Sequence, residues 1–367
     1  MELAPILEKY RDKTLLNSRL QKATTFKEQQ QALNAMISCR SAGKEIQVYC
    51  PDCDKVSWYY HSCGHRNCPK CQHHETARWI DRQRRKLLPV DYFLVTFTLP
   101  AELRSVARRY PKIIYDLMFA LASQAVMEAM GNPKRLGGLI GLTGVLHTHS
   151  RRLGYHPHIH FIVPGVALLQ KKGLCVQTRK RFLVYGDVLG RLFRGKFIAG
   201  LKELGIRFPR VPYKKNWVVD CKYSGKGDST LKYLARYLYR GVISEKNILS
   251  DQNGEVTFQY TNSTTKQTET RTLPGEDFSR LVLQHALPKG FRRVRDFGFL
   301  HGNSKKKLWK LQLLLIPKIG AHLLIKRPVF KCSHCGKPAI IIAVGVCRSI
   351  AERDRSPPAV TELVIAM

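Results

Sequence analysis

The stretch LHTHSRRLGYHPHIHFIVPG, residues 146–165, places five histidines around one short turn. The runs on either side are apolar and rich in β-branched residues, and the turn SRRLGY between them predicts a β-hairpin. Pairing about this turn sets His147 opposite His158. The next pair is then His149 with His156. Because strand side chains alternate between two faces, all five histidines are expected on one face of the hairpin.

Two interpretations of this pattern stay open: an exposed polar face on an edge strand, or a metal site. His158 and His160 offer two imidazoles to a divalent metal, while the isoleucine between them anchors the other face in the core. His147 on the neighbouring strand is the expected third ligand, with His149 and His156 in reserve. Such a set leaves coordination positions open, where a metal can polarise a phosphate oxygen.

A second pattern, LKYLARYLYR at 231–240, is amphipathic at helical spacing. Its leucines share one face. Tyr233 and Tyr237 lie on the opposite face, one turn apart, and Arg236 and Arg240 lie beside them. The alternatives are two solvated tyrosines on a basic face, or two nucleophiles beside phosphate-binding arginines. A tyrosine of pKa about 10 becomes a useful nucleophile when a metal polarises the phosphodiester and cations stabilise the phenolate.

Six of the eleven cysteines fall between positions 39 and 71, in a chain that shows no export signal, which favours metal over disulfides. Two CxxC pairs predict one closed, structural Zn²⁺ site of four thiolates, serving DNA binding rather than catalysis: Cys50, Cys53, Cys68 and Cys71. Nearby residues are left over, either as a second zinc site or as buried spectators: Cys39, His61, Cys63 and His65. A single CxxC, Cys332 and Cys335, lacks a clear second pair.

The charge of the chain indicates its class of partner. It has 62 Lys and Arg against 27 Asp and Glu, a formal net charge of +35. A folded chain this basic holds polyanions, and nucleic acid is the expected one; a ribosome-like or membrane-surface protein is the alternative. The start, MELAPILEKYRDK, has no apolar leader, and no apolar run approaches the ~20 residues of a membrane span. No membrane partner is therefore expected.

The order of the expected elements predicts an α+β fold. Strands and helices interleave without a regular βαβ rhythm around a central hairpin, which favours a largely antiparallel sheet. Three regions are expected along the chain. They are 1–88, a helical segment plus a zinc-binding, DNA-contacting domain; 89–316, a catalytic domain; and 317–367, a tail with the single CxxC.

Several of these blocks together resemble one known family. CPDC, SCGHRNCPKCQ, the HPHIH strand, YLARYLYRGVIS and LPKGFRRVRDFGFL are similar, in this order, to the rolling-circle transposases of the insertion sequence 91 family. That family is a two-tyrosine branch of the HUH endonucleases, which are named for the histidine-hydrophobic-histidine strand, and it has an N-terminal zinc-binding domain. The resemblance covers roughly residues 30–315.

The resemblance implies an HUH endonuclease-type antiparallel sheet flanked by helices, preceded by a small zinc-binding domain. It also implies Mg²⁺ or Mn²⁺ at His158 and His160. Tyr233 and Tyr237 would nick single-stranded element ends through a 5′-phosphotyrosine and transfer the strands. The implied partner is DNA, as element ends and target, and the implied location is the bacterial cytoplasm, at the nucleoid during action. Alternatives are a replication initiator or relaxase with the same chemistry, or a non-catalytic zinc-dependent DNA-binding protein.

Overall fold

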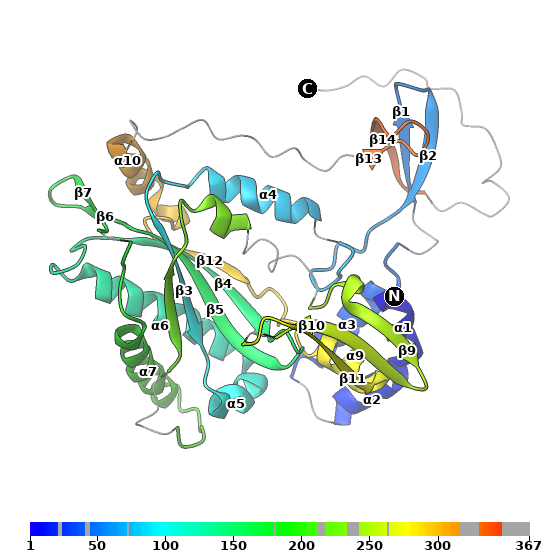
Figure 1. Cartoon of the computed structure of the whole chain (residues 1–367), viewed down its shortest axis with the longest axis horizontal. Coiled ribbons are helices and arrows are strands. Elements are labelled where there is room, and N and C mark those ends of the chain that lie inside the picture. The colour runs from blue at the N-terminus through cyan, green and yellow to red at the C-terminus, as the bar shows by residue number, and fades with distance from the viewer. Residues whose placement is uncertain are drawn as a thin grey trace.

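A five-stranded antiparallel sheet has the histidine-rich hairpin at its centre (Figure 1). The strand with three of the histidines has a neighbour on each side, so the edge-strand interpretation is wrong. In sheet order the strands are β12 (Val294–Gly298), β4 (Gly141–His149), β5 (Tyr155–Pro164), β3 (Tyr92–Thr98) and β8 (Val219–Tyr223). This computed structural model describes residues 1–20, 24–40, 45–71, 73–179, 181–211, 217–232, 242–262, 264–315 and 330–346.

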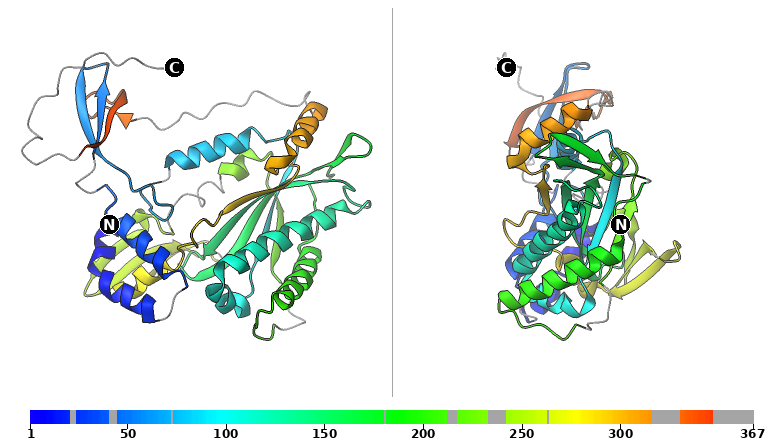
Figure 2. Two further views of the ribbon diagram at one scale, coloured as in Figure 1. Left: turned by 180° about the vertical axis from the view of Figure 1, so that it is seen from behind. Right: turned by 90° about the vertical axis from the view of Figure 1, so that its left-hand side faces the viewer.

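One face of this sheet is buried under two long helices, α6 (Pro111–Gly131) and α7 (Gly186–Glu203) (Figure 2). Phe119 of α6 meets Phe161 of β5 edge to face, with ring centroids 6.5 Å apart. Burying one such side chain contributes about 1.5–3 kcal/mol. Gly144 of β4 leaves room for this packing, because a Cβ there would lie 2.5 Å from the Phe161 ring.

α6 is also long and apolar enough, by length and composition, to cross a membrane. The expectation that no apolar run reaches this length is therefore wrong for this helix. Its apolar side chains, among them Ile114, Met118 and Val126, pack in the core against the sheet. A core helix covered by a sheet on one side and by α7 on the other has the same apolar composition.

The opposite face of the sheet carries His147, His158 and His160 and a second apolar cluster. Val145 and Ile162 lie on this face and pack with side chains of two helices and with Leu231. Leu231 is 2% exposed. The chain that enters residues 233–241 is therefore buried on the histidine face. The two helices are α4 (His73–Arg84) and α10 (Lys305–Leu315).

A separate core joins the N-terminus to residues 242–286. Three helices pack with a three-stranded antiparallel sheet and one further helix around side chains such as Leu7, Leu33 and Phe278. The first 40 residues thus share a core with a segment more than 200 positions away. The elements are α1 (Leu3–Lys9), α2 (Arg11–Leu20), α3 (Phe26–Ile37), β9 (Ile248–Gln252), β10 (Glu255–Thr261), β11 (Thr268–Pro274) and α9 (Gly275–Leu283).

A third unit, a small sheet of order β13-β14-β1-β2, joins residues 45–60 to residues 330–346. β1 pairs with β2 on one side and with β14 on the other, as both figures show. The strands are β1 (Glu45–Cys50), β2 (Lys55–Tyr60), β13 (Phe330–Lys331) and β14 (Pro338–Val346). Short elements complete the fold: α5 (Arg104–Arg109), β6 (Val166–Leu169), β7 (Leu174–Gln177), η1 (Ala101–Leu103), η2 (Glu245–Asn247) and η3 (Gly302–Ser304).

The predicted α+β class, with an antiparallel sheet flanked by helices, is confirmed. The expected regions 1–88, 89–316 and 317–367 follow chain order, and the packing crosses both of their boundaries. The N-terminal helices share a core with α9, and β14 extends the sheet that β1 begins. Hydrophobic faces are buried against whichever element is adjacent in space, so position along the chain does not divide these units.

Candidate metal centres and active site

Three histidine side chains converge on one face of the central sheet. His147 on β4 lies opposite His158 on β5, as the hairpin register predicts, and His160 is two residues further along β5. Their ring centroids are 4.7–5.3 Å apart. One ring nitrogen of each lies within 4.8 Å of the others. Imidazoles at this spacing can bind one ion and leave coordination positions open.

A register shift separates the other two histidines of the hairpin. His149 pairs with Tyr155, so the expected pairing with His156 is wrong. The turn closes with a 2.9 Å hydrogen bond from the Ser150 amide to the Gly154 carbonyl. That closure leaves one extra residue on β5, which the strand accommodates as a β-bulge. The periodicity of the sequence does not show such a bulge.

Hydrogen bonds orient His158 and His160, the two histidines of β5 that converge with His147. His158 Nδ1 lies 2.7 Å from the His156 carbonyl, which only accepts, so His158 carries its proton on Nδ1. His160 Nδ1 lies 2.7 Å from the hydroxyl of Thr96, its cross-strand neighbour on β3. With Nδ1 engaged in both rings, Nε2 is the nitrogen available to an ion. Outer partners of this kind are typical of metal-binding histidines.

His156, one of the reserve candidates, has a different partner. Arg104 of α5 donates a 2.7 Å hydrogen bond from Nη2 to its Nδ1. The His156 ring lies 5.2 Å from the ring of His158. Arg104 therefore places a permanent positive charge next to the three converging histidines, where an anionic group could use it.

Burial keeps these imidazoles neutral. It lowers the pKa of His160 to about 3 and the pKa of His156 to about 4, and it holds the pKa of His147 well below its usual range. Neighbouring imidazoles act in the same direction, because adjacent positive charges repel. The neutral form is the one that binds a metal. Three nitrogen ligands fit a first-row transition ion better than Mg²⁺, which prefers oxygen.

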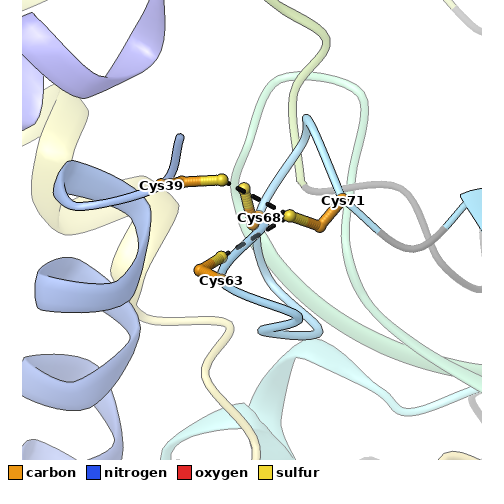
Figure 3. Close-up of side chains that lie close together, drawn as sticks. All are labelled: Cys39, Cys63, Cys68 and Cys71. Carbon is orange, nitrogen blue, oxygen red and sulfur yellow. Dashed lines mark hydrogen bonds between the residues drawn. The ribbon is translucent and has the colours of Figure 1, made fainter. Parts of the chain in front are cut away.

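Four cysteines form a compact group, here called the helix cluster, at the end of α3 (Figure 3). The Sγ atom of Cys71 lies 3.4 Å from that of Cys39 and 3.6 Å from that of Cys63. Four thiolates placed tetrahedrally at about 2.3 Å from Zn²⁺ would be about 3.8 Å apart, close to this spacing. Three of the four side chains are buried in the core of the N-terminal helices. The members are Cys39, Cys63, Cys68 and Cys71.

A second group, here called the sheet cluster, joins the first CxxC pair to the last. The Sγ atoms of Cys50 and Cys335 are 3.5 Å apart, and so are those of Cys53 and Cys332. The His334 amide donates to Cys332 Sγ at 3.4 Å, the kind of hydrogen bond that stabilises a thiolate. The pairing of β14 with β1 brings these four residues together. They also fit a tetrahedral zinc site.

The zinc site expected from sequence spacing is not formed. Cys50 and Cys53 lie in the sheet cluster. Cys68 and Cys71 lie in the helix cluster. The reason is tertiary: the turn after β1 faces the C-terminal strand, whereas the second pair packs against α3. The described cysteines fit two zinc ions in place of one.

The expected second set is rearranged as well. Cys39 and Cys63 do lie together, but with the second CxxC pair and not with histidines. His61 is exposed. His65 accepts a hydrogen bond at Nδ1 from the Asn67 amide, 3.3 Å away. Neither histidine belongs to a metal-ligand group in the described part of the chain.

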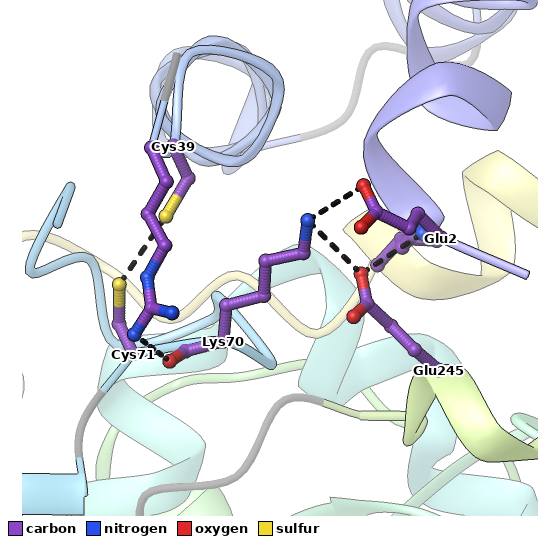
Figure 4. Close-up of polar contacts among 7 residues, drawn as sticks. Glu2, Cys39, Lys70, Cys71 and Glu245 are labelled. Atoms are coloured by element: carbon purple, nitrogen blue, oxygen red, sulfur yellow. Dashed lines mark hydrogen bonds and ion pairs between the residues drawn. The ribbon is translucent and has the colours of Figure 1, made fainter. Parts of the chain in front are cut away.

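An ionic contact joins the helix cluster to the segment after residue 241 (Figure 4). Lys70 Nζ lies 2.8 Å from the carboxylate of Glu2 and 3.8 Å from that of Glu245. Glu245 also accepts the amide of Leu3 at 3.0 Å. Ile243 is buried in the same core as the cluster. The chain that leaves residues 233–241 is thus fixed against the helix cluster.

The predicted nucleophiles and their arginines lie outside the described residues, in the interval between 232 and 242. They are Tyr233, Tyr237, Arg236 and Arg240. The chain before them is well fixed: Asp228 forms a 2.7 Å ion pair with Arg84 of α4. The described chain is therefore held by ion pairs on both sides of this interval.

Sequence reasoning missed several residues of these sites. Thr96 and Arg104 orient histidines, but a strand threonine and a helical arginine carry no distinguishing signal. Cys332 and Cys335 did carry one, because a lone CxxC pair needs a second pair to complete a tetrahedral site. His285 is buried under the hairpin, with its ring 5.5 Å from that of His149.

Comparisons with known proteins define the class. Residues 141–307 match the family described as "Putative transposase", and residues 6–99 match the "Transposase zinc-binding domain". The chain is 31% identical over 330 residues to "Putative transposase y4qJ" of Sinorhizobium fredii, over 83% of this chain and 81% of that protein. It is 29% identical over 289 residues to the "Transposase for insertion sequence element IS801" of Pseudomonas savastanoi pv. phaseolicola, over 74% and 70%.

These matches are those of a transposase. Within that class the chain belongs to the insertion sequence 91 family, with its N-terminal zinc-binding domain, and the predicted family is confirmed. Solved structures of the conjugative relaxase TrwC also align. A complex with oriT DNA described as metal-free has a TM-score of 0.28 and 15% identity, over 60% of this chain and 70% of that chain. A complex with mutant oriT DNA has a TM-score of 0.27 and the same identity, over 60% and 71%.

Proposed function

We propose that this transposase is a metal-dependent nickase and strand transferase that cuts single-stranded element ends through a 5′-phosphotyrosine intermediate and moves them by rolling-circle transfer. Tyr233 and Tyr237 are the nucleophiles. His147, His158 and His160 bind Mn²⁺ or Mg²⁺. The observation that carries the proposal is the convergence of three neutral imidazoles on the sheet face from which the tyrosine-bearing segment departs.

Cleavage exchanges one phosphate ester for another. A tyrosine oxygen attacks phosphorus as its proton passes to solvent, the bond from phosphorus to the 3′ oxygen breaks, and that oxygen takes up a proton as a free 3′-hydroxyl. The metal, when bound, supplies positive charge that polarises a phosphate oxygen. Arg104, held on His156, adds a fixed cation where negative charge develops. The new ester keeps the bond energy, so another 3′-hydroxyl can attack it and complete the transfer.

The histidines themselves bind and do not transfer protons in this scheme. His158 and His160 each have Nδ1 engaged by a neighbour, so Nε2 is the atom that would hold an ion. Burial lowers the pKa of both rings, so near neutral pH they are neutral and carry no acidic imidazolium proton to donate. The ordered partners Thr96 and the His156 carbonyl therefore fix the ligand geometry before metal or DNA arrives.

The presence of two tyrosines allows the protein to make two cleavages. Moving an element requires a second cleavage while the first DNA end is still attached. Tyr233 and Tyr237 are expected one helical turn, about 5.4 Å, apart, so both can serve one metal in alternation. Arg236 and Arg240 are expected to hold the phosphate during the exchange. Tyr233→Phe and Tyr237→Phe should each keep some single cleavage and lose complete strand transfer.

A covalent-adduct assay tests the proposal. The full-length protein is incubated with Mn²⁺ or Mg²⁺ and single-stranded DNA that carries the element ends, and the products are separated on a denaturing gel. We expect a DNA–protein adduct with the wild type and none with His158→Ala or His160→Ala. DNA binding by these variants should be nearly intact, because the basic surface supplies most of the affinity.

His301→Ala, which replaces an exposed histidine, is the matched control and should form the adduct normally. The double variant Tyr233→Phe, Tyr237→Phe should form none. Full adduct formation by His158→Ala in the presence of Mg²⁺, or by the double tyrosine variant, would contradict the proposal.

A further inference from the structure

A cavity of about 490 Å³ lies where the central sheet unit meets the N-terminal helices. Its walls come from α2, α3, α5, α6 and α9 and from the first residue of β5. The volume falls within the range of about 300–1,000 Å³ that is typical of sites for small ligands. The cavity lies outside the histidine site and both cysteine clusters, and nothing in the proposed chemistry uses it.

All charged side chains that the described part of the chain contributes to this cavity are positive. Its lining among the described residues includes three arginines and no aspartate or glutamate: Arg108, Arg109 and Arg280. Arg280 already has an acidic partner, Asp277, at 3.0 Å. Arg108 is held by neutral groups, since it donates to Gln284 at 3.0 Å and lies 4.8 Å from the centre of the Tyr155 ring. A guanidinium held in this way keeps its charge and further N–H donors for an anion.

α5 connects this cavity to the histidine site. Arg104, at the start of the helix, donates to His156 beside the metal-site histidines. Arg108 is one turn further along, about 6 Å up the same side of the helix. β5 also connects the cavity to the histidine site. Tyr155 lines the cavity, and the residue that follows it in the strand is His156. A chain of phosphates leaving the histidines would follow these cations into the cavity.

The neutral lining suits a nucleobase. Gln29 lines the cavity, together with the hydroxyl of Thr25, to which its Nε2 donates at 3.2 Å. Gln284 has its amide engaged by Arg108, Leu153 and Leu281, so it positions Arg108. Gln29 is 6% exposed, so its amide is sheltered from bulk water. Side-chain amides and hydroxyls are the groups that pair with the edges of unstacked bases in single strands. Phosphate-binding arginines and an amide that can pair with a base therefore meet in one cavity that is open to solvent on one side.

We infer that this cavity binds one nucleotide of the single-stranded DNA that is cut at the histidine site. Arg108 and Arg109 hold its phosphate, and the remaining N–H and the oxygen of the Gln29 amide contact its base. This inference rests on the proposed function and deepens it, because it places a sequence-reading position next to the cleavage site. It requires that DNA affinity and base preference depend on residues that touch neither metal nor scissile phosphate.

Fluorescence anisotropy of the metal-free, full-length protein with a labelled single-stranded oligonucleotide tests the inference. Arg109→Gln removes an exposed charge of the cavity, and Ser105→Trp fills the cavity without removing charge. We expect Arg109→Gln to weaken binding about three- to tenfold and to reduce the salt-dependence slope by about 0.7. Ser105→Trp should weaken binding to a similar degree. Arg191→Gln, an exposed arginine of α7 outside the cavity, is the matched control.

Three outcomes decide the matter. Loss of affinity in both cavity variants but not in Arg191→Gln supports the inference. Affinity and salt slope equal to those of Arg191→Gln overturn it. A mononucleotide such as dAMP that binds the wild type at this cavity without competing with the oligonucleotide assigns the cavity to a free nucleotide and also overturns it. Failure of the proposed function would look different: the wild type would bind DNA and form no covalent adduct with Mn²⁺.

Discussion

Replacing Cys39 and Cys335 in separate variants tests whether the cysteines bind zinc in the helix cluster and the sheet cluster or in the single site expected from sequence spacing. Neither residue belongs to the four-thiolate site predicted from sequence spacing, so that site would keep its zinc in both variants. In the structure, each residue is one of four ligands in a different cluster. We expect the wild type to hold two zinc ions, Cys39→Ser and Cys335→Ser to hold one each, and the double variant to hold none.

The effects on stability should differ sharply between the two variants. Cys39 is 5% exposed and lies in one core with Leu7, Leu33 and Phe278. A structural zinc supplies about 10–16 kcal/mol to the folding of zinc-finger peptides, as much as the whole stability of a typical domain, about 5–15 kcal/mol. Loss of the ion from the helix cluster is therefore expected to unfold the N-terminal helices together with β9, β10 and α9.

Cys335 has a different setting. It is exposed, and Ile340, Ile341 and Val344 on β14 are 58%, 47% and 58% exposed, so the described part of this sheet has a thin core. Loss of zinc from the sheet cluster should open β1, β2 and β14 locally. The main unfolding transition should move by less than about 2 °C, which corresponds to less than about 1 kcal/mol in a body of this size.

Metal analysis by mass spectrometry after desalting gives the zinc content of each variant. Hydrogen exchange of α1 and α3 against β1 and β14 reports which unit has opened, and calorimetry gives the main transition. One zinc ion in the wild type and in both single variants would refute the two-cluster assignment. An equal loss of the main transition in Cys39→Ser and Cys335→Ser would refute the reasoning about their different cores.

Three further variants test the site. Thr96→Val should weaken Mn²⁺ binding about tenfold in calorimetry because His160 loses its orienting partner, whereas Thr98→Val, its neighbour two residues along β3, should not. Burial lowers the pKa of His285 to about 4, against about 6.5 in the unfolded chain. Its neutral form therefore stabilises the fold above about pH 6.5, and this contribution is lost as the pH falls towards 4. His285→Gln should make the decrease of Tm over this pH range smaller. Glu245→Ala removes the carboxylate that joins Lys70 and the Leu3 amide to the segment after residue 241, and it should lower adduct yield without loss of zinc.

The hairpin shows how far the sequence alone reaches. A side-chain period of two and a short turn are local properties, and they place His147 opposite His158 correctly. The same reasoning misplaced His149, because the closing hydrogen bond of the turn and the resulting bulge depend on backbone geometry that residue types do not encode. The sheet face of the metal-site histidines was predictable, but their orienting partners, which come from other elements, were not.

The cysteines show that sequence spacing does not predict which residues share a metal site. Spacing predicted zinc-binding cysteines between 39 and 71, because a thiolate pair at CxxC spacing is a local motif, and all six of these cysteines belong to groups that could hold a metal ion. It did not identify the groups, because the partners of Cys50 are 282 and 285 positions away and arrive only when β14 pairs with β1. A tetrahedral site takes whichever four thiolates the fold brings together, so chain proximity is a weak guide to its membership.

Residues next to the cysteine motifs link the zinc-binding region to the chemistry. Arg84 pairs with Asp228 just before the tyrosine-bearing segment, and Lys70 contacts Glu245 just after it. Partly exposed pairs of this kind contribute only about 0.2–1 kcal/mol each, too little to hold the fold together. They are enough to fix where the segment begins and ends. We therefore expect loss of zinc from the helix cluster to lower cleavage, which would make the zinc-binding domain a support for the proposed active site.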